Sequence, residues 1–236
     1  MNVQKQARHP ATEATRMAAI VERLKEVYPH MVCALEWGGQ HGGERDFLLQ
    51  ESWRLLVMGR LSAQCTDARV NIVCRDLFQQ FPTVESMANA AVEDIEDIVR
   101  PCGLYHTKAQ NIKDACRILV EDHGGIVPDD MESLLALPGV GRKIANLLLG
   151  DVYKKGGVVT DTHCIRICGR LGFYPETVKE PLKVERILTP LIDPAEQSDF
   201  CHRIVQFGRD TCMARSPACG ECPLRDLCKH VQLPSK

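Results

Sequence analysis

The stretch Leu137-Pro138-Gly139-Val140-Gly141-Arg142-Lys143 decides the fold of this 236-residue chain. Its two glycines allow a tight turn and let backbone N–H groups approach a ligand, because no Cβ stands in the way. A helical apolar pattern resumes over residues 144–149, so Gly141 and Arg142 are expected at the N-terminus of a helix. The free amides and the dipole of such an N-terminus favour an anion. The stretch therefore predicts a hairpin between two helices that can hold a phosphate.

Lys143 and Asp161 are the candidate chemical groups beside this hairpin. Lys143 lies in the first turn of the expected helix, and a lysine amine can act as a Schiff-base nucleophile. Asp161 follows eighteen positions later, in Thr160-Asp161-Thr162-His163, and precedes another helical apolar pattern. A carboxylate at that place can cap a helix. The residues alone therefore leave open whether Asp161 is an N-cap, a catalytic group or both.

Composition sets the class of protein but not its activity. The chain is 44% hydrophobic and 25% charged, which predicts a globular protein with room for two modest cores. No apolar run approaches the ~18 residues that cross a bilayer, and residues 1–8 lack the apolar segment of a secretory signal. We therefore expect an intracellular, cytoplasmic protein that contacts no membrane. With a net charge of -2, affinity for nucleic acid must come from a local surface.

Twelve cysteines in an intracellular chain need an explanation other than disulfides. Four lie near the C-terminal end with the spacing Cys212-x6-Cys219-x2-Cys222-x5-Cys228, which indicates one metal centre. Zinc and iron–sulfur clusters both take four cysteines. Zinc ribbons usually have two Cys-x2-Cys pairs, whereas this spacing has one pair flanked by single cysteines, so a [4Fe-4S] cluster is favoured over zinc. The other eight are expected to be small buried apolar side chains: Cys33, Cys65, Cys74, Cys102, Cys116, Cys164, Cys168 and Cys201.

Helical periodicity runs through nearly the whole chain, without a convincing β-hairpin signal. N-caps are expected at Thr83, Thr107 and Asp161, and Gly124-Gly125 is expected to end the helix that starts at Thr107. The stretch Gly38–Gly43 is typical of a surface loop or a domain boundary. These signals together predict an all-α fold.

Five segments, in their order and spacing, carry a resemblance to a known family: Leu61-Ser62-Ala63-Gln64, Gly103-Leu104-Tyr105, the 137–143 hairpin, Asp161-Thr162-His163 and the cysteine spacing. From Met17 to Cys228 the chain resembles the endonuclease III family of base-excision DNA glycosylases, within the helix-hairpin-helix superfamily. The resemblance implies an all-α, two-domain helix-hairpin-helix DNA glycosylase fold with a C-terminal [4Fe-4S] cluster loop. A six-helix domain would span residues 44–155. A discontinuous iron–sulfur cluster domain would span residues 1–43 and 156–236, with DNA in the cleft between the domains.

The resemblance also implies an activity. The chain would be a base-excision repair DNA glycosylase with AP lyase activity on oxidised pyrimidines in damaged double-stranded DNA, acting as a monomer with the chromosomal DNA. Lys143 would attack C1′ of a flipped nucleotide, expel the base and form a Schiff base that permits β-elimination of the 3′ phosphate. Asp161 would help activate the amine and stabilise positive charge at C1′. The four cysteines of the 6-2-5 spacing would hold the [4Fe-4S] cluster, which staples a segment too short for its own core.

DNA contacts follow from the same resemblance. Gln64 would enter the hole left by the flipped base from the orphan-base side, and Leu104 would wedge in from a neighbouring loop. The other expected DNA contacts are Gly139, Gly141, Arg142, His163 and Arg215.

Three residues depart from the family pattern. Ile144 and Thr160 replace residues that are common beside the catalytic pair, which puts rate or substrate preference in doubt. Arg60 interrupts an apolar helix four positions before Gln64 and hence on the same face. A contact between Arg60 and DNA near the lesion is a hypothesis from this placement.

Two other functions fit parts of the sequence. A monofunctional glycosylase for mismatches or other lesions would have the same fold, but those relatives lack a lysine at the position of Lys143. A non-catalytic DNA-binding protein would use the hairpin and the cluster loop as a structural module. The presence of both Lys143 and Asp161 favours an enzyme over that alternative.

Overall fold

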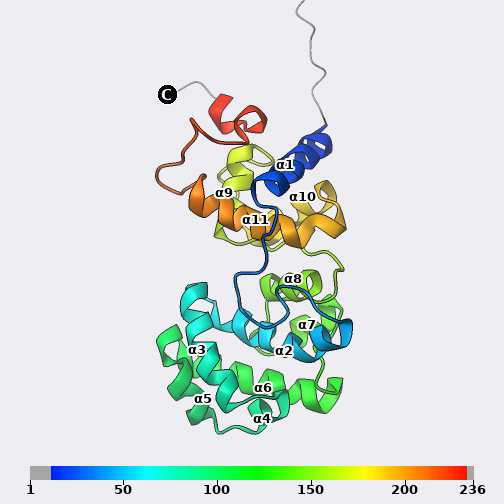
Figure 1. The fold of residues 1–236 in the computed structure, drawn as a ribbon, viewed down its shortest axis with the longest axis vertical. Helices are drawn as coiled ribbons and strands as arrows, with labels where there is room; N and C mark the ends of the chain where they lie inside the picture. The colour runs from blue at the N-terminus through cyan, green and yellow to red at the C-terminus, as the bar shows by residue number, and fades with distance from the viewer. Residues whose placement is uncertain (1–11, 233–236) are drawn as a thin grey trace, which may run out of the picture.

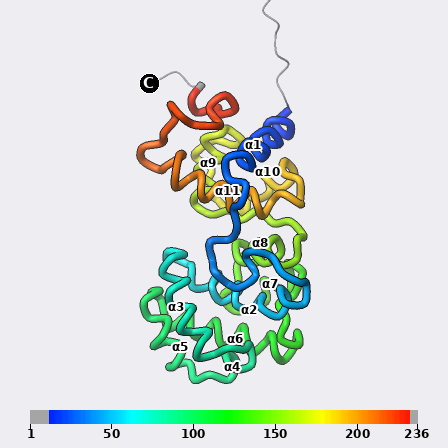
Figure 2. The backbone as a smooth tube through the Cα atoms, viewed as in Figure 1, coloured from blue at the N-terminus to red at the C-terminus, as the bar shows by residue number. Residues whose placement is uncertain are grey.

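The computed structural model describes residues 12–232, and over this range the chain forms α-helices and short 3-10 helices without a β-strand. Two groups of helices lie one above the other along the long axis, each with its own apolar core (Figures 1 and 2). The predicted all-α, two-domain fold is confirmed. Between residues 12 and 232, no helix has both the length and the apolar character that crossing a bilayer requires.

The first group contains seven α-helices between residues 44 and 155, one more than expected. They are α2 (Arg45–Leu61), α3 (Asp67–Gln80), α4 (Val84–Asn89), α5 (Val92–Val99), α6 (Tyr105–His123), α7 (Met131–Ala136) and α8 (Arg142–Asp151). The backbone leaves the helical region at Ala90 and Ala91, where ψ is 149° and 138°. One expected helix, which Thr83 caps, is therefore divided into α4 and α5.

The second group joins the N-terminal helix to the C-terminal part of the chain. It contains α1 (Glu13–Val27), α9 (Thr162–Leu171), α10 (Pro181–Leu188) and α11 (Gln197–Asp210), followed by the cysteine loop. Nη1 of Arg16 donates to the carbonyls of Leu171 and Leu227, at 2.8 and 3.0 Å. Arg23 donates to the carbonyl of Pro223 at 2.7 Å. These contacts fix α1 to the cysteine loop.

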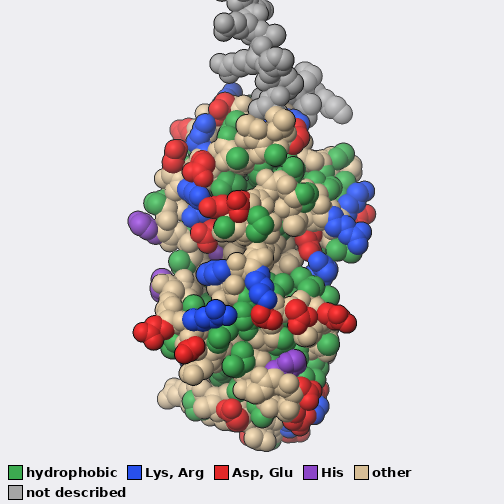
Figure 3. Space-filling view, turned by 90° about the vertical axis from the view of Figure 1, so that its right-hand side faces the viewer, with side chains coloured by type: hydrophobic (Ala, Val, Ile, Leu, Met, Phe, Trp, Pro, Cys, Tyr) green, Lys and Arg blue, Asp and Glu red, His purple; other side chains and the backbone are tan. Residues whose placement is uncertain are grey.

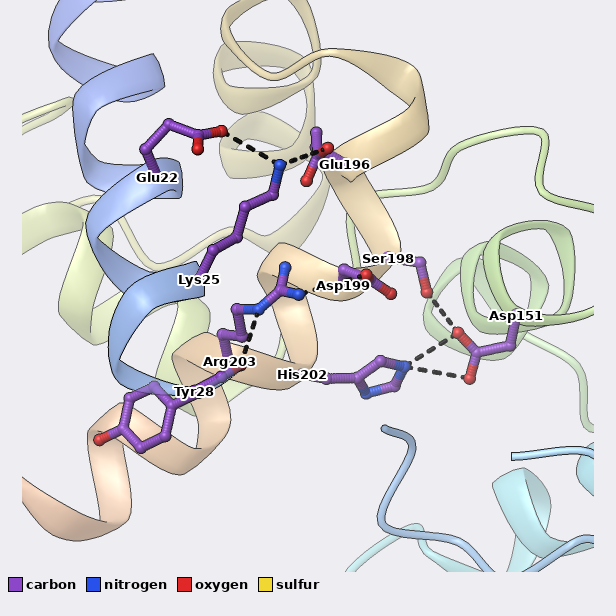
Figure 4. Close-up of polar contacts among 9 residues, drawn as sticks. All are labelled: Glu22, Lys25, Tyr28, Asp151, Glu196, Ser198, Asp199, His202 and Arg203. Atoms are coloured by element: carbon purple, nitrogen blue, oxygen red, sulfur yellow. Dashed lines mark hydrogen bonds and ion pairs between the residues drawn. The ribbon is translucent and has the colours of Figure 1, made fainter. Parts of the chain in front are cut away.

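Polar contacts also join α1 to the region of α11 (Figure 4). Nζ of Lys25 forms an ion pair with Glu196 at 2.7 Å, just before α11 begins. Nε of Arg203, within α11, donates to the carbonyl of Tyr28 at 3.2 Å. Polar contacts therefore fix the N-terminal helix to two other parts of the second group, the cysteine loop and the region of α11.

The segment between α1 and α2 packs partly on the first group. Cys33, Leu35 and Trp37 are buried in the first core, although the sequence analysis placed the first domain boundary after residue 43. The domain boundaries stay a prediction, and the packing of these three side chains favours a first boundary before residue 33.

Three of the four expected helix ends are confirmed. Thr83 caps α4, Asp161 caps α9, and Gly124 ends α6 in the left-handed conformation at φ 59°. The prediction of Thr107 as an N-cap is wrong, because α6 begins two residues earlier. Its N-cap is Leu104, whose left-handed backbone (φ 50°) turns the chain into the helix.

Candidate active site and cluster loop

The hairpin between α7 and α8 has the geometry that its glycines allow. Gly139 is in the left-handed region at φ 76°, and the N–H of Val140 donates to the carbonyl of Leu137 at 3.1 Å, which closes the turn. Gly141 is the N-cap of α8 and has no side chain to bond the first-turn amides. Because the first N–H groups of a helix lack an intrahelical acceptor, this end presents donors and the positive end of the dipole to an anion. The predicted helix-hairpin-helix motif is present.

Lys143 and Asp161 come from different helix groups, at the starts of α8 and α9. Lys143 is exposed in the first turn of that helix. After α8 the chain returns along it, since Nδ2 of Asn146 donates to the carbonyl of Val158 at 3.1 Å. A Cβ at Gly157 would lie only 2.5 Å from the carbonyl oxygen of Asn146, so glycine is required for this close return. The segment thus follows α8 as far as Val158, three positions before Asp161.

Asp161 is a helix cap, as one of its two readings predicted. Its Oδ1 accepts a hydrogen bond from the N–H of Cys164 at 2.8 Å. The side chain is partly exposed. Capping orients the carboxylate at the start of α9 and does not conflict with a catalytic role.

Ile144 and Thr160, which follow Lys143 and precede Asp161 in the sequence, are both buried. Ile144 is 8% exposed, and a Cβ at Gly59 would lie 3.3 Å from its Cγ2. Ile144 therefore fills the space that Gly59 leaves between α2 and α8. Thr160 is 7% exposed. Both side chains are therefore buried packing residues, each next in sequence to a member of the candidate catalytic pair.

Arg142 pairs with a carboxylate of the second helix group. Its Nε and Nη2 donate to the two oxygens of Glu185 in α10, at 3.0 and 2.5 Å. This hydrogen bonding with Glu185 raises the pKa of Arg142. A bidentate pair of this kind is geometrically specific. The guanidinium of Arg142 is therefore bound to Glu185 and joins α8 to α10. The backbone of Arg142 lies in the first turn of α8.

Gln64 and Leu104 are both exposed on loops of the first group. Leu104 is 59% exposed, so it is not a core leucine. Gln64 and Leu104 have φ of 58° and 50°, which non-glycine residues rarely adopt. The two expected wedge residues therefore share exposure and a left-handed backbone.

Arg60 supports the hairpin from behind. Its Nε and Nη2 donate to Oδ1 of Asn111 at 3.1 and 2.9 Å. A Cβ at Gly139 would lie 2.6 Å from Nε of Arg60, so the guanidinium packs directly under the turn. The hypothesis that Arg60 contacts DNA stays a prediction; in this structure its partners are Asn111 and the hairpin.

His163 is half-buried between α9 and α11. Its Nδ1 lies 3.2 Å from Nη2 of Arg166. A Cβ at Gly208 would lie 2.4 Å from Nδ1 of His163. Burial lowers the pKa of His163, and the nearby Arg166 and Arg209 act in the same direction. The surroundings of His163 therefore disfavour the charged imidazole.

The four cysteines of the 6-2-5 spacing converge on one cavity. All four line it, and the remaining wall is mainly apolar; it includes Ile167, Leu171, Phe207 and Pro217. The thiols are free, so no disulfide competes for them. Four thiols around one mainly apolar cavity are a donor set that fits an iron–sulfur cluster. Of the other eight cysteines, seven are buried and Cys65 is partly exposed, as expected for apolar packing.

Two arginines that the sequence analysis missed hold the first half of the cysteine loop. Nη2 of Arg166 donates to the carbonyl of Cys212 at 3.1 Å. Arg170 donates to the carbonyls of Met213 and Ala214 at 2.8 and 2.7 Å. The sequence feature that could have identified them is their spacing of four positions within an apolar helix, because residues four apart lie on one face of a helix. Arg215 follows these contacts and is exposed.

A buried polar cluster at the junction of the two groups was also missed (Figure 4). The Asp151 carboxylate, at the end of α8, accepts from Ser198 and His202 of α11, with His202 Nε2 at 2.9 and 3.1 Å from its two oxygens. The Cys33 thiol belongs to the same cluster, and the ligand atoms of Cys33, Asp151 and His202 all lie within 4.8 Å of one another. Two hydrogen-bond donors, Ser198 and His202, thus satisfy the buried carboxylate, and the Cys33 thiol lies close to it.

The Asp151–His202 pair predicts a pH-dependent stability. Burial would lower the pKa of His202, but the hydrogen bond and charge of Asp151 outweigh it and leave the pKa raised above 6.5. A raised folded pKa stabilises the protein fully below the unfolded value and loses this contribution as pH rises through the folded value. We expect His202→Gln to remove about 2 kcal/mol at pH 6, equivalent to about 4–8 °C in the melting temperature, and less at pH 8.5.

Thermal melts of the two proteins at both pH values measure this difference. His106→Gln is the control, because it removes an exposed imidazole at 2.7 Å from Glu96 and should change the melting temperature little. The same His202→Gln effect at pH 6 and pH 8.5 would show that protonation of His202 does not contribute.

Comparisons with known proteins agree with this site. Residues 57–194 match the family model described as "HhH-GPD superfamily base excision DNA repair protein". Residues 212–228 match the "Iron-sulfur binding domain of endonuclease III". The class of protein is thus a helix-hairpin-helix base-excision repair protein, and its cofactor is a [4Fe-4S] cluster.

Relatives narrow the class further. Endonuclease III of Synechocystis sp. is 40% identical over 226 residues, covering 95% of this chain and 97% of the relative. A solved non-covalent endonuclease III–DNA complex has a TM-score of 0.81 and 34% identity, covering 93% of this chain and 96% of that one. A trapped covalent endonuclease III–DNA intermediate has the same TM-score and identity, with coverage of 93% and 97%. The chain belongs to the endonuclease III family.

Proposed function

We propose that Lys143 and Asp161 carry out the chemistry of this enzyme, a DNA glycosylase and AP lyase of base excision repair. The observation that supports these roles is the placement of an exposed lysine in the first turn of a helix without a side-chain cap, while the chain that leads to Asp161 runs back along the same helix. The helix end attracts the phosphate backbone, and the lysine stands next to it. One solved relative is a trapped covalent intermediate with DNA, which is the kind of species that a lysine nucleophile forms.

The two steps use the same nitrogen. The neutral amine of Lys143 attacks C1′ of a flipped nucleotide, and the bond from C1′ to the damaged base breaks as the new C–N bond forms. The base takes up a proton as it leaves. The attacking nitrogen then gives up a proton and the C1′–O4′ bond of the sugar breaks, so that O4′ becomes a hydroxyl and a protonated Schiff base forms between C1′ and the nitrogen. The Schiff base acidifies the C2′ position; loss of a C2′ proton gives an enamine, and the C3′–O bond breaks to release the 3′ phosphate. The Asp161 carboxylate, oriented by its capping bond, stabilises the positive charge at C1′.

Local groups rather than net charge hold the DNA. The chain has a net charge of -2, yet on one face Lys and Arg side chains lie near the waist between the two helix groups (Figure 3). The amides at Gly139 and Gly141 would bind phosphate, with Arg142 contributing its backbone. His163 and Arg215 would contact the strand from the second group. Gln64 and Leu104 would fill the space of the flipped base.

The cluster loop has a structural part in this proposal. Cys212, Cys219, Cys222 and Cys228 would hold the [4Fe-4S] cluster, which supplies four metal–thiolate bonds that staple the loop. Arg166 and Arg170 hold the carbonyls of the same loop from α9. The loop would then present Arg215 to the DNA backbone from a fixed position.

The substrate proposed is damaged double-stranded DNA with an oxidised pyrimidine, bound by a single copy of the chain in the cytoplasm with the chromosomal DNA. A panel of duplexes, each with one defined lesion, tests this proposal when strand cleavage and borohydride trapping are measured together. We expect cleavage and a covalent adduct with oxidised pyrimidines and with an abasic site. Base release without cleavage or adduct would instead indicate a monofunctional glycosylase, and binding without base release would indicate a non-catalytic DNA-binding protein.

A further inference from the structure

Lys108 is a buried lysine whose ammonium contacts the first residue of two short segments, residues 61–64 and 102–104. These segments lead to Gln64 and Leu104 and are called the wedge loops below. It lies in α6, one turn after Leu104, and its relative exposure is 0%. Its Nζ donates to the carbonyl of Leu61 at 2.9 Å and to that of Cys102 at 2.7 Å. Leu61 ends α2 three positions before Gln64, and Cys102 ends a 3-10 turn two positions before Leu104. One side chain therefore joins the two loops from beneath.

The buried ammonium of Lys108 is stabilised by the two carbonyl groups that accept its hydrogen bonds. A buried cation is unfavourable unless it is paired or hydrogen-bonded, and burial lowers the pKa of Lys108. Both acceptors are the final carbonyls of helical segments, which lack an intrahelical partner and lie at the negative end of a dipole. The ammonium and the two carbonyls therefore stabilise one another in the absence of a carboxylate.

Both wedge residues need a support of this kind. Gln64 and Leu104 have left-handed backbones, at φ 58° and 50°, and among residues 12–232 the remaining non-glycine residue with positive φ is Lys154. Such strain persists where the surrounding structure fixes the loop. Both side chains are exposed, so burial in a core does not fix them. The carbonyls that Lys108 holds lie two or three positions before each strained residue.

We propose that Lys108 is a positioning residue that sets the spacing between the Gln64 and Leu104 loops, so that both side chains enter the space of a flipped nucleotide together. The inference rests on the proposed function, because it needs a nucleotide to be flipped from a duplex. Lys108 itself contacts backbone carbonyls and acts on DNA through the two loops.

Lys108→Met tests the inference, because methionine has a similar length and apolar stem but no donor. Two substrates separate positioning from a general structural defect: a duplex with one oxidised pyrimidine, and a single strand with one abasic site, which has no opposite base and no hole to fill. We expect kcat/KM on the duplex to fall about 10–100-fold, as for a small misplacement of a distant group. Cleavage of the single strand should change less than about twofold. Lys113→Met, on the same helix, is the matched control and should leave both activities unchanged.

A double-variant cycle gives the second measurement. If Lys108 acts through the two wedge residues, Lys108→Met should cause a smaller loss in the Gln64→Ala, Leu104→Ala background than in the wild-type background. Equal losses on both substrates, an unchanged duplex activity, or full additivity would overturn the inference. If Lys108→Met does not fold, Lys108→Gln, which keeps one N–H donor group, replaces it and should give a smaller loss on the duplex alone. Wild-type protein inactive on both substrates would contradict the proposed function instead.

Discussion

Replacing Lys143 with alanine is expected to abolish covalent trapping of the protein on abasic DNA by borohydride. The adduct requires an amine that has formed a Schiff base at C1′, and Lys143 is the proposed source of that amine. Excision from a lesion duplex should fall by about 10³-fold or more, as when an enzyme loses its nucleophile. The fold should be preserved, because Lys143 is exposed and alanine is a good helix former. Gel separation of protein–DNA adducts and single-turnover excision measure the two losses.

Lys143→Arg is the matched control for this variant. Arginine keeps a positive charge at the start of α8 but stays protonated, so it cannot form the Schiff base. We expect it to bind an abasic duplex within about threefold of the wild type and to form no adduct. An undiminished adduct from Lys143→Ala would reject Lys143 as the nucleophile.

Gly139→Ala is expected to have the largest effect of any change at the hairpin that leaves the catalytic pair intact. Alanine at φ 76° is strained, and its Cβ would lie 2.6 Å from Nε of Arg60 and 2.8 Å from Oδ1 of Asn111. The strain and the displaced Arg60–Asn111 contact should destabilise the protein by about 1–3 kcal/mol. Displacement of the turn should weaken DNA binding by about tenfold or more, measured by titration of a labelled duplex at two salt concentrations.

Gly141→Ala separates the fold of the hairpin from its contact with DNA. Gly141 has an extended φ of -102°, and no atom lies within 4 Å of a Cβ built there. Its loss of stability should therefore stay below about 1 kcal/mol, the difference between glycine and alanine at an N-cap. If the phosphate approaches this backbone as proposed, Gly141→Ala weakens DNA binding while lowering the melting temperature by less than about 4 °C. Unchanged binding by both glycine variants would contradict a phosphate contact at the hairpin.

Local signals in the sequence predicted the features that depend on near neighbours along the chain. The glycines of the hairpin, the caps at Thr83 and Asp161 and the left-handed end at Gly124 all act within one helical turn. The cysteine spacing likewise predicted convergence on one centre, because its four members lie within seventeen positions. Such features need no knowledge of which distant segments pack together.

Features that depend on distant partners could not be predicted in this way. Arg142 was expected to contact DNA through the hairpin, yet its guanidinium pairs with Glu185, 43 positions away. Lys108 has the sequence context of an ordinary helix residue, and its acceptor at Leu61 is 47 positions earlier. The start of α6 was placed at Thr107 because a threonine is a good cap, whereas the helix is capped at Leu104, whose left-handed backbone has no signal in the sequence.

The attachment of α1 to the cysteine loop also has a consequence for the order of folding during synthesis. Arg16 and Arg23 hold carbonyls that lie 211 and 200 positions further along the chain. At roughly 5–20 residues per second, a ribosome takes about 10–40 s to make that interval. In this time the chain from Cys33 to Val152 supplies the whole first core, whereas the residues that share a core with α1 begin only at Val158. The half that carries the hairpin therefore completes its core first, and the N-terminal helix, although made earliest, is among the last elements to be packed.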